Sequence, residues 1–156
     1  MKHFILSLTL GITLVFIGCQ KQTETGSDAQ GHTLPTDITT KTNADVTKQL
    51  PLEDQQDFKE ARRGFIATDP NLVVKTHNGN TIWDQPSYSF IQGAAPASVN
   101  PSLWRQAKLN NIHGLFKVTE GVYQLRGFDL ANITLIEGKT GWIIVDPLTS
   151  KETAAR

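Results

Sequence analysis

The C-terminal stretch of the chain decides the fold class, and residues 135–156 read LIEGKTGWIIVDPLTSKETAAR. Two β-prone runs, Ile133–Glu137 and Trp142–Val145, flank the sequence Gly-Lys-Thr-Gly, and this pattern predicts a β-hairpin. The second run is wholly apolar, which is typical of a strand that is covered on both faces. The sequence therefore predicts that layers lie on both sides of this hairpin.

A helix is expected directly after the hairpin. Asp146-Pro147 ends the apolar run, because the ring of proline and the preference of aspartate for turns interrupt a strand. Thr149 and Glu152 have the spacing of a capping box, so the helix is predicted to begin at Ser150. Strands followed by a helix indicate an α/β, or α+β, layer architecture.

Upstream of residue 133, the sequence alternates between helical and extended patterns. A helix is predicted to start at Pro51, with Phe58, Ala61 and Phe65 on one face and Gly64 near its end. A second is predicted from Asn100-Pro101 to Asn110-Asn111. The predicted strands are 72–76 and 81–84, joined by the turn residues His77-Asn78-Gly79-Asn80, and then 115–118 and 122–126.

The N-terminus predicts export. A short basic start is followed by an apolar run, Phe4–Ile17, which is too short to span a membrane but fits a secretory signal peptide over residues 1–18. Gly18-Cys19 follows at once and resembles a lipobox, although Phe16 stands where leucine is favoured. We expect Cys19 to carry lipid and to anchor an exported lipoprotein facing the periplasm or the cell exterior. The alternative is an ordinary signal peptide followed by a free thiol.

Residues 19–50 are predicted to be a flexible tether after the lipidated cysteine. The segment is rich in Thr, Gln, Asp and Lys and lacks aromatic residues, so it cannot bury enough apolar surface to offset its ordering entropy. The folded part is expected over 51–156. A formal net charge of zero and the absence of a basic patch argue against a nucleic-acid partner.

The residues by themselves show no active site. His32 falls in the predicted tether and His77 in a turn, while His113 is a metal ligand only if distant partners converge on it. Arg62-Arg63 is either an anion site or a solvated helix end. Tyr88 and Phe90 are expected to line a pocket or to pack beneath their loop. No Gly-rich phosphate loop or nucleophile elbow is present.

A resemblance adds to this interpretation. The segments DFKEARRGFIA, NPSLWRQAKLNNIHGLFKVTEGVYQLRGFDLANITLIEGKTGWIIVDPLTSKETA and Trp83-Asp84 between them resemble the linear primary alkylsulfatases of the metallo-β-lactamase superfamily. The similarity runs from about Leu50 to the end of the chain. It implies the N-terminal β-layer, with the helices leading into it, of an αββα metallo-β-lactamase-type domain that is incomplete here.

The resemblance also implies an activity, which is hydrolysis of alkyl sulfate esters such as dodecyl sulfate to alcohol and sulfate. The family uses two zinc ions and forms homodimers. Its zinc ligands begin with a His-x-His-x-Asp-His loop that this sequence lacks, so the chain is expected to contain no catalytic residue and no metal ligand and to be inactive alone. Asp146 matches an aspartate that orients the metal-ligand loop through second-shell hydrogen bonds. The alternative role for Asp146 is that of a turn residue.

Two other functions are open. The chain is alternatively a non-catalytic, membrane-anchored binding lipoprotein, or part of another metallo-β-lactamase-type hydrolase. The segment NPSLWRQ favours alkylsulfatases over the wider superfamily.

Overall fold

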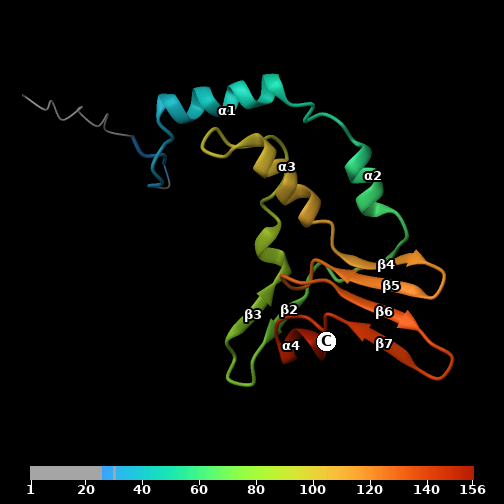
Figure 1. Ribbon diagram of the computed structural model, residues 1–156. Helices are drawn as coiled ribbons and strands as arrows, with labels where there is room; N and C mark the ends of the chain where they lie inside the picture. Colours follow the sequence, from blue (N-terminus) through green and yellow to red (C-terminus); the bar gives the residue numbers. More distant parts are fainter. Residues whose placement is uncertain (1–25, 30) are drawn as a thin grey trace, which may run out of the picture.

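The computed structural model, which describes residues 26–29 and 31–156, is an α+β fold. The α-helices before residue 111 lie at one end, and the antiparallel strands lie at the other with the C-terminal helix among them (Figure 1). A five-stranded sheet has the order β1-β4-β5-β6-β7, and β2 and β3 form a separate hairpin. The predicted α+β class is confirmed. The elements are α1 (Asp37–Gln49), α2 (Gln56–Arg62), β1 (Phe65–Ala67), β2 (Val73–Lys75), β3 (Thr81–Asp84), η1 (Gln85–Tyr88), α3 (Pro101–Asn110), β4 (Gly114–Thr119), β5 (Val122–Arg126), β6 (Ile133–Glu137), β7 (Trp142–Val145) and α4 (Lys151–Ala154).

Helix α1 corrects part of the expectation of a flexible tether over residues 19–50. Thr36 caps the helix by accepting a hydrogen bond from the backbone N–H of Thr39, and Asp37 and Lys48 complement the helix dipole. The side-chain amide of Asn43 donates to the carbonyl of Ala97 at 2.8 Å. None of the α1 residues is buried, so local capping accounts for the helix better than burial does. The predicted boundaries at residues 18 and 50 stay predictions, and residues 1–25 lie outside the described residues.

Helix α2 begins later than predicted, at Gln56 instead of Pro51. The carboxylate of Asp54 accepts from the backbone N–H of Gln56 at 2.9 Å and so starts the helix. Phe58 is buried and the guanidinium of Arg105 lies 5.1 Å from its ring centroid. Arg105 also pairs with Asp57 at 2.8 Å, and these contacts join α2 to α3.

The five-stranded sheet is held together around Phe116, which is fully buried on β4. The ring of Phe65 packs edge-on against it with centroids 5.6 Å apart, and the guanidinium of Arg126 lies 4.6 Å from the centroid of the Phe116 ring. Phe65 therefore belongs to strand β1 and not to the helical face predicted for it, because Gly64 turns the chain between α2 and β1.

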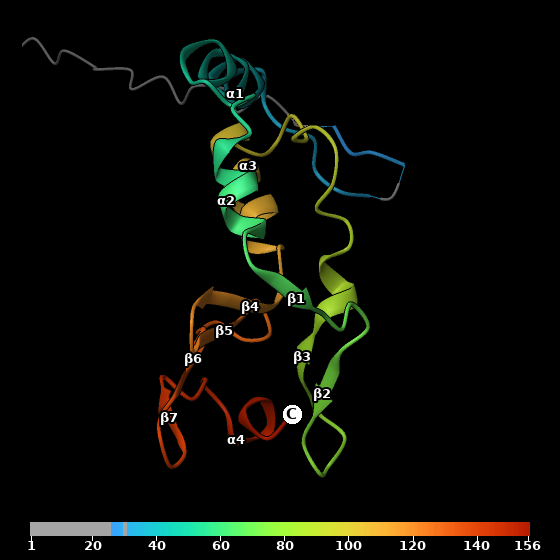
Figure 2. The same ribbon diagram turned by 90° about the vertical axis from the view of Figure 1, so that its right-hand side faces the viewer.

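Helix α4 lies between the five-stranded sheet and the β2–β3 hairpin (Figure 2). Its N-cap is Ser150, which accepts from the backbone N–H of Thr153, so the predicted capping box on Thr149 is wrong. Leu72 and Val74 of the hairpin region and Ile133 of β6 are among the buried hydrophobic residues of the described chain.

Strand β7 differs from its expected environment. Its four apolar residues are exposed to between 49 and 58 %, although an apolar strand of this kind is expected to be covered on both faces. It also forms the outer edge of the sheet, beyond β6. Within the described residues, the edge strand of the sheet is therefore not covered by another element.

Gly64 and Gly79 form a matched pair that tests the packing of β1 on β4. Both have positive φ, but a Cβ at Gly64 would lie 2.0 Å from the carbonyl oxygen of Lys117, whereas a Cβ at Gly79 would meet no atom within 4 Å. We predict that Gly79→Ala lowers the free energy of unfolding by about 1–2 kcal/mol, the cost of the left-handed conformation alone. Gly64→Ala should cost at least twice as much. Urea unfolding of both variants gives the comparison, and equal losses would contradict it.

Candidate functional site

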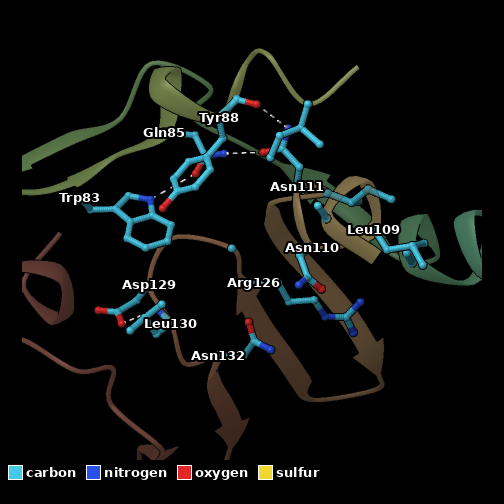
Figure 3. Close-up of a pocket in the computed structure, with 15 residues that line it drawn as sticks. Trp83, Gln85, Tyr88, Leu109, Asn110, Asn111, Arg126, Asp129, Leu130 and Asn132 are labelled. Atoms are coloured by element: carbon cyan, nitrogen blue, oxygen red, sulfur yellow. Dashed lines mark hydrogen bonds between the residues drawn. The ribbon is translucent and has the colours of Figure 1, made fainter. Parts of the chain in front are cut away.

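A pocket of about 450 Å³ lies where the hairpin, the end of α3 and the loop between β5 and β6 meet. Figure 3 shows Trp83 and Tyr88 on one side of it and Asn110 and Arg126 on the other. Several lining residues are polar and several are aromatic or aliphatic. The lining is Ala61, Trp83, Gln85, Tyr88, Ile91, Ala107, Leu109, Asn110, Asn111, Ile112, Arg126, Gly127, Asp129, Leu130 and Asn132.

The aromatic wall is fixed by a chain of hydrogen bonds. Trp83 Nε1 donates to Gln85 Oε1 at 3.2 Å, and Gln85 Nε2 donates to Asn111 Oδ1 at 3.2 Å. Asn111 Nδ2 then donates to the carbonyl oxygen of Tyr88 at 3.3 Å, and the rings of Trp83 and Tyr88 lie 5.5 Å apart. Gln85 is buried with both ends of its amide satisfied, so the wall is held in place before any ligand arrives.

Asp129, which also lines the pocket, connects the loop between β5 and β6 to the residues that follow β7. It is only 6 % exposed, and its carboxylate accepts from the hydroxyl of Thr149 at 2.5 Å and from that of Thr153 at 2.5 Å. The backbone N–H groups of Leu130 and Thr149 donate to it as well, at 2.6 and 3.3 Å. Burial alone would raise the pKa of Asp129, but these hydrogen bonds together hold it below its usual value.

Arg126 lies at the other end of the pocket without an acidic partner. Its Nε donates to Gln124 Oε1 at 2.6 Å, and it forms no ion pair with any described carboxylate within 4.0 Å. Burial, and secondarily the positive charge of Arg63, lower the pKa of the guanidinium, which nevertheless stays protonated at neutral pH. Among the described residues, the positive charge of Arg126 therefore has no ion-pair partner.

The structure places Asp146 away from this pocket. It is exposed, has a positive φ of 54°, and lies in a turn in which the backbone N–H of Leu148 donates to its carbonyl oxygen at 2.8 Å. Its side chain makes no hydrogen bond to the described residues. The second-shell role predicted for Asp146 stays a prediction, and Cys19 lies outside the described residues.

The other candidate residues are divided between the pocket and the surface. Tyr88 lines the pocket, but Phe90 is 67 % exposed and its ring lies 6.1 Å from that of Trp104. His113 bonds to the hydroxyl of Thr68 at 2.5 Å, and partial burial lowers its pKa while Asp69 opposes that shift. His77 lies in the predicted turn between β2 and β3.

A zinc site is not formed by the described residues. No three His, Cys, Asp or Glu side chains among them converge on one point. Zinc in proteins needs at least three such ligands, and the oxygens of Asp129 are already occupied by four donors. The residues of the described part therefore do not fit a metal centre.

Sequence reasoning missed Asp129 and Arg126. Asp129 belongs to the segment RGFDLANIT on which the resemblance rests, but an aspartate in a loop carries no local sign that two threonines twenty and more residues away will bind it. The sequence pattern predicts Arg126 only as the last residue of the strand 122–126. Its unpaired state depends on which side chains the fold brings near it.

The comparisons with known proteins agree with this fold. The chain is 45 % identical over 153 residues to a linear primary-alkylsulfatase of Pseudomonas sp., 97 % of this chain and 22 % of that protein. The chain is homologous to the alkylsulfatases. An alkyl/aryl-sulfatase of Saccharomyces cerevisiae is 49 % identical over 74 % of the chain and 18 % of its own length.

The solved structures include relatives of this alkylsulfatase homologue. A stereoselective inverting sec-alkylsulfatase from Pseudomonas sp. superposes with a TM-score of 0.72 at 47 % identity, and its double mutant with 0.74 at 46 %. These matches cover 77 and 78 % of this chain and 19 % of each solved chain. No family model matches. The chain spans about a fifth of the length of the relatives it matches.

Replacing Asp129 tests its role in joining the two loops. We predict that Asp129→Asn lowers the free energy of unfolding at pH 7 by about 2 kcal/mol, because charge-assisted hydrogen bonds are lost in a buried site. Asp146→Asn, at an exposed position, is the matched control and should change stability by less than about 0.5 kcal/mol.

The loss of stability caused by Asp129→Asn should depend on pH. Since the folded-state pKa of Asp129 is depressed, its contribution is complete above the unfolded-state pKa of about 4 and is lost as pH falls through the lower folded-state value. The difference between wild type and Asp129→Asn should therefore shrink in acid. A difference that is constant from pH 7 to pH 3 would show that the charge is not involved.

Proposed function

We propose that the chain serves the hydrolysis of linear primary alkyl sulfate esters, of the dodecyl sulfate type, to alcohol and sulfate. The observation that carries this proposal is the 45 % identity to a linear primary-alkylsulfatase over 97 % of the chain. The segments on which the resemblance rests include β4–β7, and β5 contributes Arg126 to the pocket. In this proposal, the described residues supply a supporting layer and a polar pocket, and no catalytic group.

Zinc chemistry and dimer formation are part of the same proposal. The described residues do not fit a zinc centre, so two zinc ions would be held by sequence other than theirs. A zinc pair is proposed on the resemblance to metallo-β-lactamase-type enzymes, and a homodimer on the same basis. The exposed face of β7 supports the idea that further polypeptide covers this sheet in an active enzyme.

A second candidate function is that of a binding lipoprotein without catalysis. The observation that favours it is a formed pocket with a positive charge in a part of the chain that lacks a metal-ligand cluster. The two functions differ in whether this segment supports sulfate ester hydrolysis when it is part of an alkylsulfatase.

A chimera tests the proposed hydrolytic role. The matched segment of the Pseudomonas linear primary-alkylsulfatase is replaced with this chain's residues, and sulfate release from dodecyl sulfate is measured with zinc present. We expect activity comparable to that of the parent enzyme, since nearly half of the residues in the exchanged segment are identical. The present chain alone should release no sulfate.

Two controls make the result of the chimera interpretable. Sedimentation and thermal unfolding show whether the chimera folds and assembles like the parent. A chimera that matches the parent in both but releases no sulfate would contradict the proposal. Sulfate release by the present chain alone, above a metal-free control, would contradict the expectation that it holds no catalytic group.

We also propose that the protein is exported and attached to a membrane through lipid on Cys19. The support is the apolar run that ends in Gly18-Cys19. None of the helices in the described part of the chain is long and apolar enough to cross a membrane. Two or more acyl chains on one cysteine would anchor the protein stably, whereas a single chain would not.

Cell fractionation tests this attachment. The unchanged protein is expected in the membrane fraction, and Cys19→Ser should shift it to the soluble fraction because the site of acylation is lost. Ser7→Ala, within the apolar run, is a control that should leave the distribution unchanged. An unchanged protein that is already soluble in the periplasm or the medium would rule out the anchor.

A further inference from the structure

The turn between β2 and β3 contains a dipeptide that can react with itself. Asn78 is the only asparagine of the chain that a glycine follows. The backbone nitrogen of the next residue can attack an asparagine side chain, and glycine hinders this attack least because it has no Cβ. Asn78 and Gly79 are both exposed, and a Cβ built on Gly79 would meet no atom within 4 Å. No residue beyond its chain neighbours therefore crowds the attacking nitrogen.

Thr76 takes part in three hydrogen bonds that close this turn. Its backbone N–H donates to the carbonyl oxygen of Asn80 at 2.9 Å, and its own carbonyl oxygen accepts from the backbone N–H of Gly79 at 3.0 Å. Its hydroxyl oxygen accepts from the backbone N–H of Asn80 at 3.1 Å. The nitrogen that would attack Asn78 is thus held by the carbonyl group of Thr76, and the attack requires the turn to open.

The surroundings of the turn favour such opening. It lies at the outer end of the hairpin (Figure 1 and Figure 2), and residues 77–80 are all exposed. Segments with few buried contacts open locally at a small cost in free energy, without unfolding of the whole chain. The hydrogen bonds of Thr76 therefore set the fraction of time in which the backbone nitrogen of Gly79 is free to react.

We propose that Asn78 is a site of spontaneous deamidation and that Thr76 controls its rate. The backbone nitrogen of Gly79 bonds to Cγ of Asn78, the bond from Cγ to the side-chain nitrogen breaks, and the backbone amide proton leaves with that nitrogen as ammonia. Water then opens the cyclic imide that has formed. Cleavage between the ring nitrogen and Cγ gives aspartate, and cleavage between the ring nitrogen and the main-chain carbonyl carbon gives isoaspartate.

Isoaspartate should alter the hairpin. It moves a side-chain carbon into the main chain, so the spacing that lets Thr76 bond to both Gly79 and Asn80 changes. Strands β2 and β3 pair in a register that places Lys75 opposite Thr81 at this turn. Turn geometry fixes the register of a hairpin. The modified hairpin should therefore lose the hydrogen bonds of the turn first and its pairing register next.

Mass spectrometry of the full chain during incubation at neutral pH tests the site. Peptides that contain Asn78 should gain the mass that replacement of NH₂ by OH adds, and isoaspartyl methyltransferase should label a part of them. Asn80 is exposed in the same turn but precedes the β-branched Thr81, so it is an internal control that should stay intact. Asn78→Gln should abolish the conversion, because the longer side chain closes a ring far more slowly.

Variants of Thr76 test its control of the rate. Thr76→Val keeps the shape of the side chain but removes the hydroxyl that accepts from Asn80. Deamidation should become about fivefold faster, which is the factor that loss of one hydrogen bond gives. Thr76→Ser keeps the hydroxyl and should stay within about twofold of wild type. Hydrogen exchange of the Gly79 amide should accelerate with deamidation in Thr76→Val, because both reactions need the same opening.

Two results with these proteins would overturn the proposal. One is an Asn78 that stays intact in the folded chain under conditions that deamidate it in the urea-unfolded chain. The other is an equal rate in wild type, Thr76→Val and the unfolded chain, which would show that the dipeptide reacts without control by Thr76.

Urea below the unfolding transition gives a further test on the unchanged chain, so the proposal does not depend on how well the variants fold. Deamidation of Asn78 and hydrogen exchange of the Gly79 amide should become faster together as the turn opens more often. A deamidation rate that stays constant while exchange accelerates would rule out control by the turn.

Discussion

The buried carboxylate of Asp129 is the interaction on which the arrangement of the C-terminal half depends. It joins the β5–β6 loop to the turn that follows β7 and to the first turn of α4, through Thr149 and Thr153. A carboxylate removed from water is costly unless its oxygens accept hydrogen bonds. These donors therefore favour the arrangement in which the β5–β6 loop, the turn after β7 and α4 lie together. The other contacts that position α4 include its Ser150 cap and its packing against β2 and β3.

The same carboxylate influences the pocket in two ways. It fixes the loop that carries Leu130 and Asn132 into the lining, and its charge is compensated before a ligand arrives. Arg126 is left without such compensation, because its neighbours are Phe116, Gln124 and the distant, like-charged Arg63. The pocket therefore combines an acid whose oxygens are hydrogen-bonded, a guanidinium without an ion pair among the described residues, and an aromatic wall.

The two ends of the five-stranded sheet differ in how well their apolar residues are covered. Phe116 is fully buried because Phe65 and Arg126 cover it, and Gly64 allows β1 to approach β4 closely enough to do so. At the opposite edge, β7 has an equally apolar sequence and no such cover. Burial therefore differs within one continuous hydrogen-bonded sheet: β4 and β6 contain buried residues, whereas every residue of β7 is exposed. This is consistent with homology to a part of alkylsulfatases that are about five times as long.

The sequence alone determined the elements whose signals are local. Turn residues at Gly79 and Gly138–Gly141, the cap at Asn100 and the runs of β4–β7 each act within a few residues of themselves, and all were predicted correctly. The helix over 37–49 was missed because composition outweighed its good cap at Thr36. Only the tertiary structure decided that Asp129 binds Thr149, so that Ser150 and not Thr149 caps α4. It also decided that Arg126 forms no ion pair with the described residues, because pairing depends on contacts between residues far apart in the chain.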